Sequence, residues 1–139
     1  MGQTLMLVKP DAMQKGVAGE ILASVQGAGF AVRSLKTLRL SMSEAEAFYA
    51  EHSSRPFYRD LVSFMTSGEI LAIALEREDA VAVLRQLIGS TDSRTAAAGT
   101  IRARFGTDNQ RNAVHASDSP TSAQRELAFF FSTRELLSQ

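Results

Sequence analysis

The chain has 139 residues, a length typical of one domain with a real core, and we expect a single domain over residues 1–139. Basic and acidic residues balance at 15 each, which argues against a specific nucleic-acid partner, and the lack of cysteine excludes disulfides, thiolate metal sites and a cysteine nucleophile. The first eight residues lack the features of a signal peptide, and no apolar run reaches the roughly 18 residues of a membrane helix, so we expect a cytoplasmic protein.

Patterns typical of strands and of helices alternate along the chain. Short apolar runs that end at Gly, Pro or polar residues indicate buried strands, whereas apolar residues three and four apart indicate helices with one face on a core. In chain order we predict a strand at 4–8, a helix at 17–28, a strand at 30–40, a helix from a cap at Ser41 or Ser43 to about 51, a helix at 57–66, a strand at 70–75, a helix at 78–88, a strand at 112–114, and a helix that Ser119 caps and Pro120 begins.

This order of elements predicts an α+β fold. Four strands with helices between them fit the β-α-β-β-α-β arrangement of a ferredoxin-like domain, an antiparallel four-stranded sheet covered by helices. Residues 90–111 stand apart as a long polar loop with a weak helical patch at 96–98. Polar segments of this length within a compact domain are often functional.

The polar loop carries arginines ahead of a histidine. The planar fork of arginine suits phosphate, although a solvated loop is the simpler interpretation of the arginines alone. The loop contains Arg94, Arg102, Arg104 and Arg111. No Gly-x-x-x-x-Gly-Lys-Ser/Thr motif and no Gly-x-Gly-x-x-Gly motif occurs, so the sequence does not predict a P-loop or a dinucleotide fold.

His115 is a candidate nucleophile. It follows a short apolar run and precedes a helix start, with Ser117 and Asp118 available as partners. A neutral imidazole is a competent nucleophile near pH 7 when a second group orients its ring. From spacing alone, a hydrogen-bonded loop histidine is the simpler interpretation. The other histidine, His52, is far away in the chain, and two such histidines without cysteine do not predict a structural zinc site.

Four short motifs give the pattern a specific meaning. They are Lys9-Pro10-Asp11, Arg55-Pro56-Phe57 followed by Leu61, Gly99-Thr100-Ile101-Arg102, and the run Asn112-Ala113-Val114-His115-Ala116-Ser117-Asp118-Ser119. In this order and spacing, the chain resembles the nucleoside diphosphate kinase family over nearly its full length. The resemblance implies a ping-pong transfer of the γ-phosphate from a nucleoside triphosphate to a diphosphate through a phosphohistidine at His115. It also implies Mg²⁺ carried mainly by the nucleotide phosphates, with few direct protein ligands.

The resemblance implies roles for the residues that match the family. Lys9 would contact the γ-phosphate and a sugar hydroxyl, and Tyr49 would lie near the transferred group. Phe57 would stack on the base with Leu61 beside it, and stacking tolerates every base. The remaining matches are Arg85 and Thr91 for the β-phosphate, Arg102 for the terminal phosphates, Asn112 for the sugar, and Ser117 and Glu126 as supports of the His115 ring. We interpret His52 as structural, at the edge of the pocket.

The chain also departs from the family pattern. Ala12 and Ala116 replace usual glycines, and a positive φ at Ala116 would carry strain of order 1 kcal/mol. Ser93 and Arg94 stand where many members carry a proline in a loop that helps subunit contacts. The resemblance implies a homo-oligomer, with a tetramer, a hexamer and a dimer all open.

Two other functions stay open at this point. The first is a nucleotide-binding module that has lost turnover, for which Ala116 is the only supporting feature. The second is a nucleic-acid-binding ferredoxin-like domain, which would need stacking aromatics on adjacent strands and a basic sheet face. The sequence shows neither of these two features.

Overall fold

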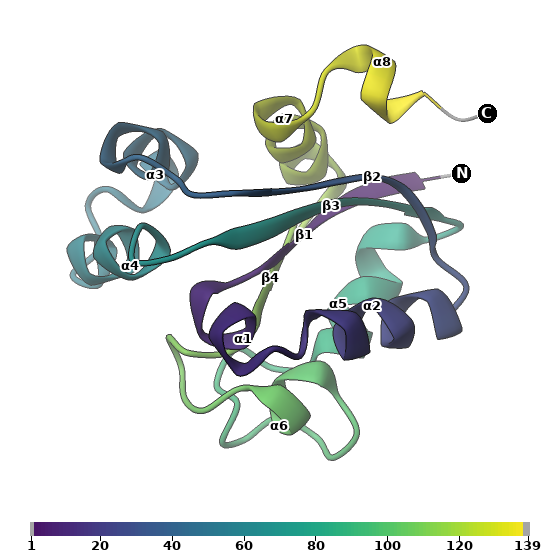
Figure 1. The fold of residues 1–139 in the computed structure, drawn as a ribbon, viewed down its shortest axis with the longest axis horizontal. Coiled ribbons are helices and arrows are strands. Elements are labelled where there is room, and N and C mark those ends of the chain that lie inside the picture. Colours follow the sequence, from purple (N-terminus) through teal and green to yellow (C-terminus); the bar gives the residue numbers. More distant parts are fainter. Residues whose placement is uncertain (1, 138–139) are drawn as a thin grey trace.

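The computed structural model describes residues 2–137 and is built on one antiparallel sheet with the strand order β2-β3-β1-β4 (Figure 1). This is the predicted ferredoxin-like order, in which the first and third strands lie in the middle. Both middle strands are almost completely buried, which explains their uninterrupted apolar sequences. The strands are β1 (Gly2–Val8), β2 (Ala31–Leu38), β3 (Ile70–Arg77) and β4 (Val114–Ala116).

Helices cover both faces of the sheet. Met6 and Val8 of β1 point into one apolar cluster, with α2 (Ala18–Gly27) and α5 (Ala80–Ile88) packed over it. Leu5 and Leu7 point the opposite way, because side chains alternate along a strand, and form a second cluster. That cluster lies under α3 (Met42–Phe48), α4 (Tyr58–Met65) and α7 (Pro120–Phe130). Since the middle of the sheet has no open face, the nucleic-acid-binding alternative is not supported.

Local capping fixes the start of two predicted helices. Ser41 rather than Ser43 caps α3, because its hydroxyl accepts the amide of Glu44 at 3.1 Å while the Glu44 carboxylate accepts the Ser41 amide at 2.8 Å. Ser119 caps α7 as predicted, and Pro120 takes the first helical position. Leu127 and Phe130 of α7 face the core.

Several short helices were not predicted. Lys9-Pro10-Asp11 does more than end β1, because Pro10 opens the helix α1 (Pro10–Lys15). After α3 the chain continues in a 3-10 turn (Ala50–His52) rather than in α-helix. The helix α8 (Thr133–Leu136) follows α7. Within residues 2–137, no helix is long and apolar enough to cross a membrane.

Two predictions near the polar loop were wrong in position. The helical patch at 96–98 is not helix; the helix α6 (Ile101–Phe105) begins later, where the Thr100 hydroxyl accepts the amide of Ala103. Gly99, with φ +89°, separates the patch from this helix. The strand expected at 112–114 is instead Val114–Ala116, because Ala113 has a φ of 74° that no strand allows. His115 therefore lies within β4 rather than after it.

Candidate active site

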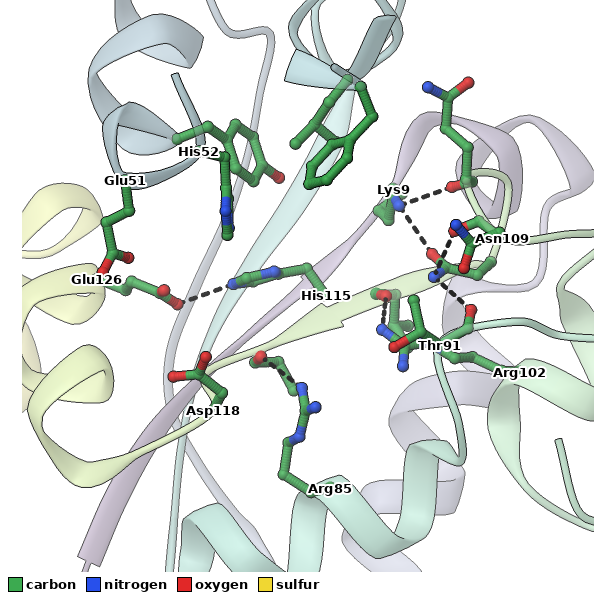
Figure 2. Close-up of a pocket in the computed structure, with 17 residues that line it drawn as sticks. Lys9, Glu51, His52, Arg85, Thr91, Arg102, Asn109, His115, Asp118 and Glu126 are labelled. Atoms are coloured by element: carbon green, nitrogen blue, oxygen red, sulfur yellow. Dashed lines mark hydrogen bonds and ion pairs between the residues drawn. The ribbon is translucent and has the colours of Figure 1, made fainter. Parts of the chain in front are cut away.

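A cavity of about 370 Å³ opens beside β4, and His115 lies across its middle (Figure 2). Glu126 of α7 lies on one side of the histidine, and Lys9 and Arg102 lie on the other. The structure brings together every predicted site residue except Ser117 as lining of this cavity, and Ser117 is linked to the lining through its hydrogen bond to Glu126. The predicted residues in the lining are Lys9, Tyr49, Phe57, Leu61, Arg85, Thr91, Arg102, Asn112, His115 and Glu126.

A carboxylate holds the His115 ring, and a hydroxyl holds that carboxylate. Nε2 of His115 lies 2.8 Å from Oε1 of Glu126, and the same oxygen accepts the Ser117 hydroxyl at 2.8 Å. The ionised carboxylate can only accept, so Nε2 carries the proton that it shares with Glu126. The other ring nitrogen, Nδ1, then holds a free lone pair. This arrangement fixes both the tautomer and the direction of the ring.

The charge on Glu126 is maintained although the side chain is buried. Burial by itself would raise the pKa of Glu126, but the hydrogen bond and the charge of His115, followed by Ser117 and Arg125, outweigh it and lower the pKa. The carboxylate therefore stays ionised at neutral pH. It can stabilise positive charge that develops on the imidazole.

Aromatic rings enclose the histidine on the side of α3. The ring of Phe48 meets the His115 ring edge-on at 5.5 Å between centroids, and Tyr49 does so at 6.2 Å. Both aromatic residues are buried. Burial, together with the charge of Glu126, raises the pKa of the Tyr49 hydroxyl, so Tyr49 is a neutral donor beside the histidine.

Lys9 is a buried cation at the opposite end of the cavity. Its ammonium group donates to the Gln110 carbonyl and to Oδ1 of Asn112, each at 2.7 Å. Burial, with a further contribution from the charge of Arg102, lowers the pKa of Lys9 to about 8 against the opposing effect of Asp11 and Asp108. An anion bound beside this lysine would favour its charged form.

Two arginines converge on the floor of the cavity from α5 and α6. Arg102 is only 5% exposed and donates to the Val114 carbonyl at 3.0 Å and to the Gly89 carbonyl at 3.1 Å. Arg85 donates to the Ala116 carbonyl at 3.2 Å. Burial and the nearby charge of Arg85 lower the pKa of Arg102 to about 10. Two neighbouring positive charges, one of which lowers the pKa of the other, favour an anion beside them.

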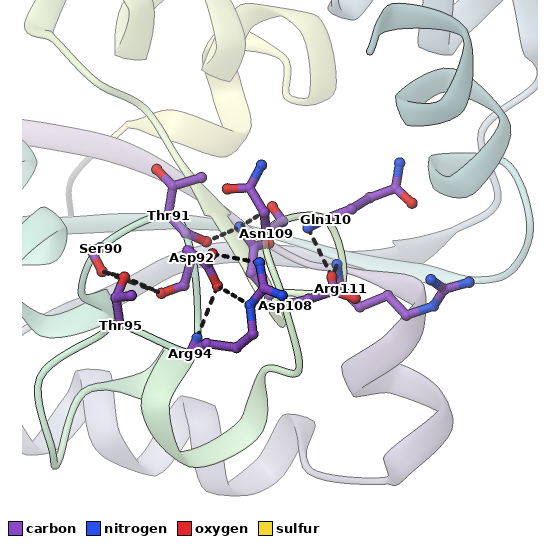
Figure 3. Close-up of polar contacts among 10 residues, drawn as sticks. Ser90, Thr91, Asp92, Arg94, Thr95, Asp108, Asn109, Gln110 and Arg111 are labelled. Carbon is purple, nitrogen blue, oxygen red and sulfur yellow. Dashed lines mark hydrogen bonds and ion pairs between the residues drawn. The ribbon is translucent and has the colours of Figure 1, made fainter.

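The polar loop is ordered by its own hydrogen bonds (Figure 3). The Asn112 side chain donates to the Thr91 carbonyl at 2.8 Å, which ties the two halves of the loop together beside the cavity. Asp92 accepts from Arg94, and one oxygen of Asp108 accepts the amides of Gln110 and Arg111. These hydrogen bonds hold the segment in one conformation beside the cavity, so it is part of the site and not only a connection between elements.

The mouth of the cavity is formed by α4. Phe57 precedes this helix and is 48% exposed, so it is not a core residue. Leu61 follows one turn later and is half-buried. His52 also lines the cavity, with its ring 5.7 Å from that of Phe57. Phe57 and Leu61 thus place apolar side chains at the entrance, with the tilted His52 ring beside them.

Sequence reasoning missed some of the lining. Glu51 brings a carboxylate to the cavity, and Asn109 and Gln110 bring amides from the polar loop. Asp118, which the sequence offered as a partner of His115, also lines the cavity. The other three carry no motif, and only the path of the loop and of the 3-10 turn places them in the lining.

The departures from the family pattern are accommodated. Ala116 lies in β4. Within residues 2–137, only Asp79 and Ala113 among non-glycine residues have a positive φ, so the backbone strain considered for Ala116 is absent. Ala12 is fully buried in α1, where helical backbone favours alanine over glycine. Ser93 is buried against Gly106, whose missing side chain leaves it room. These features remove the argument from Ala116 for a module without turnover.

Comparisons with known proteins agree with this site. The family model for nucleoside diphosphate kinase matches residues 2–136. A nucleoside diphosphate kinase of Sorangium cellulosum is 52% identical over 134 residues, which cover 96% of this chain and 93% of the relative. The structure of the Aquifex aeolicus nucleoside diphosphate kinase matches with a TM-score of 0.95 at 49% identity and covers 98% of this chain and 99% of that one.

A more distant structure shows the same architecture. The nucleoside diphosphate kinase of Halobacterium salinarum, in complex with CDP, matches with a TM-score of 0.95 at 40% identity, over 99% of this chain and 91% of that one. Sequence identity near one half over the whole chain, and a shared fold at this level, leave no other family to consider. The chain belongs to the nucleoside diphosphate kinase family, the nucleotide-binding transferases that pass a phosphoryl group from a nucleoside triphosphate to a nucleoside diphosphate.

Proposed function

We propose that His115 carries the phosphoryl group in a ping-pong reaction. The lone pair of Nδ1 attacks the γ-phosphorus of a nucleoside triphosphate, the new P–N bond forms, and the bond to the β,γ-bridging oxygen breaks. The nucleoside diphosphate leaves with that electron pair. A second diphosphate then attacks the phosphorus and frees Nδ1. The observation that supports this step most strongly is the 2.8 Å contact between Nε2 and Glu126, which leaves Nδ1 as the nucleophilic atom.

Glu126 and Ser117 make the transfer reversible in this scheme. The imidazole gains positive charge as its lone pair bonds to phosphorus, and the ionised Glu126 lies next to the Nε2 proton to stabilise it. The Ser117 hydroxyl holds the same carboxylate oxygen in place. Because little else needs to move, the transfer depends on positioning and on charge, as phosphoryl transfer generally does.

The nucleotide lies with its base at the mouth and its phosphates on the floor. Phe57 and Leu61 hold the base, and Asn112 with Lys9 binds the sugar. Arg85, Thr91 and Arg102 bind the phosphates, while Tyr49 lies beside the transferred group. The position of each group in one cavity supports this assignment, and the complex of the Halobacterium salinarum relative with CDP supports a nucleotide as the ligand. The apolar mouth suits a broad choice of bases.

A divalent cation enters with the nucleotide in this proposal, and we propose Mg²⁺. No group of three or more His, Asp or Glu side chains within residues 2–137 is placed to hold a metal. Lys9, Arg85 and Arg102 present positive charges to the phosphates in this scheme, which fits a metal carried by the phosphates themselves. A homo-oligomer, a cytoplasmic location and the single-domain extent stay predictions.

Labelling tests the proposal. Purified protein is incubated with γ-labelled ATP and Mg²⁺ and is then chased with GDP. We expect an acid-labile, base-stable label on the protein that moves to GTP during the chase. His115→Ala should fold and take up no label, whereas His52→Ala, which removes the other imidazole of the cavity, should still be labelled. Transfer by the His115→Ala variant at a normal rate would exclude the proposed carrier.

A further inference from the structure

Ala113 has an unusual backbone for its position in the site. Its φ of 74° is in the left-handed region, which side chains other than glycine rarely adopt, and it is fully buried two residues before His115. Its neighbour Asn112 lines the cavity. A strained residue at such a place persists only when its surroundings hold it there.

The Lys-Pro-Asp turn holds this residue from both sides. Oδ2 of Asp11 accepts the Ala113 amide at 3.0 Å, and the Ala113 carbonyl accepts the Lys9 amide at 2.9 Å. Pro10 lies between the two contacts and opens α1, so the turn that carries them is itself rigid. Asp11 is only 8% exposed. Its bond to Ala113 is therefore shielded from water and is not easily replaced.

The consequence reaches three groups of the site. The Asn112 amide oxygen meets the Lys9 ammonium group at 2.7 Å, directly before the left-handed residue. Directly after it the chain enters β4, where His115 pairs opposite Leu7 of β1. If Ala113 relaxed to an ordinary φ, the directions of Asn112 and His115 relative to Lys9 would both change.

We propose that Asp11 is a positioning residue for phosphoryl transfer, which acts by holding Ala113 in the left-handed conformation that sets His115 and Asn112 against Lys9. The proposal rests on the proposed function of His115. The carboxylate contacts neither reacting atoms nor nucleotide in this scheme; it acts through the backbone. Its charge has a second effect, because it lies near Lys9 and opposes the burial and the Arg102 charge that lower the pKa of that lysine.

A pair of glycine variants tests the backbone role. Asp11→Ala removes the acceptor, and we expect the single-turnover rate of His115 labelling to fall about 10- to 100-fold, the effect of a small misplacement of reacting groups. Adding Ala113→Gly should restore the rate, because glycine adopts the left-handed conformation without help. Adding Asp79→Gly instead is the matched control. Within residues 2–137, Asp79 is the other non-glycine residue with a positive φ, 57°, and it does not line the cavity, so glycine there relieves backbone strain outside the site.

The two rescues separate positioning from stability. Asp79→Gly should raise the unfolding midpoint of Asp11→Ala without restoring its labelling rate, whereas Ala113→Gly should restore the rate. Equal rescue of the rate by both glycines would mean that Asp11 is only structural and would overturn the proposal. If Asp11→Ala does not fold, the double variant with Ala113→Gly must fold and transfer, and its failure would also overturn it.

Asp11→Asn tests the charge separately. The amide oxygen still accepts the Ala113 amide, so the labelling rate at pH 7 should stay within about threefold of wild type, well short of the loss expected for a misplaced site. The alkaline limb of the pH profile should move to lower pH, because one of the two carboxylates that favour charged Lys9 is gone. A profile that does not move, or a rate as low as that of Asp11→Ala, would contradict this assignment. Wild-type labelling at His115 is measured alongside, so a wild type that takes up no label would reject the proposed function rather than the role of Asp11.

Discussion

Nε2 of His115 and Oε1 of Glu126 lie 2.8 Å apart, and this contact decides which nitrogen of the ring is free. The carboxylate keeps its charge in a buried position because the histidine is its partner. The pair therefore serves two purposes at once. It leaves Nδ1 free, and in the proposed mechanism it places a negative charge beside a ring that becomes positive on phosphorylation.

Replacing Glu126 by Gln should separate these two purposes. The amide oxygen can still accept the Nε2 proton, but the charge is lost, and we expect the labelling rate of His115 to fall about tenfold, the difference between a charged and a neutral hydrogen bond. Rapid-quench measurement with γ-labelled ATP gives this rate. Glu51→Gln is the control, since Glu51 lines the same cavity but pairs with Arg125. A larger loss in the control variant would contradict the role of Glu126.

The low pKa of Lys9 predicts a pH dependence. With a pKa of about 8 the free enzyme loses this charge as the pH rises through 8, so kcat/KM for the triphosphate should decline there. Lys9→Met should show a low value without that decline. A wild-type profile that stays flat between pH 7 and 9 would argue against the lysine.

The free energy of unfolding should rise with pH, whereas kcat/KM should fall. The folded-state pKa of Lys9 is below its ordinary value, so the cost of burying the charge is fully present below pH 8 and disappears as the pH rises toward 10.5. The free energy of unfolding attributable to Lys9 should therefore rise over that window. Urea denaturation of wild type and Lys9→Met across the window measures this difference. Parallel curves would show that the lysine is not buried in solution.

Phe57 should contribute to binding and little to stability. Its ring is 48% exposed at the mouth of the cavity, and base stacking is worth about 1–3 kcal/mol, so Phe57→Ala should raise KM for nucleotides about 5- to 150-fold. Phe129→Ala removes a similarly exposed ring that does not line the cavity, and its KM should be unchanged. Comparable KM values in both variants would remove Phe57 from the base site.

Arg102 should matter for both phosphate binding and packing. Arg102→Lys keeps the charge but loses the fork that bonds the Gly89 and Val114 carbonyls, so we expect a stability loss of about 1–3 kcal/mol. The kcat/KM for the triphosphate should fall about 10- to 100-fold. Arg104→Lys, on the exposed side of the same helix, should change neither quantity. A loss of stability without a loss of kcat/KM would make Arg102 purely structural.

Reverting Ala116 to glycine should not improve the enzyme. Ala116 is buried in a strand without positive φ, so glycine there loses packing and adds freedom to the unfolded chain, which costs about 0.5–1 kcal/mol. Thermal unfolding and steady-state transfer to GDP test this. A faster enzyme after the substitution would show that the alanine restrains the site.

The sequence determined the fold class and predicted residues that the structure brings together around one cavity. The apolar runs at 4–8 and 70–75 indicated buried strands, and Ser119 with Pro120 predicted the start of α7. The resemblance of the four motifs to the family predicted His115, Lys9 and their neighbours as site residues. These features are local or repeat a known pattern, so they can be read without knowing what packs against them.

Other features depended on residues that are distant in the chain. The left-handed Ala113 moved β4 two residues along from its predicted place, and its partner is Asp11, 102 positions away. The depressed pKa of Lys9 and the orphaned lone pair of His115 likewise follow from burial and from a carboxylate on another element. Burial and long-range hydrogen bonds exist only after the sheet has assembled, which is why only the tertiary structure could decide them.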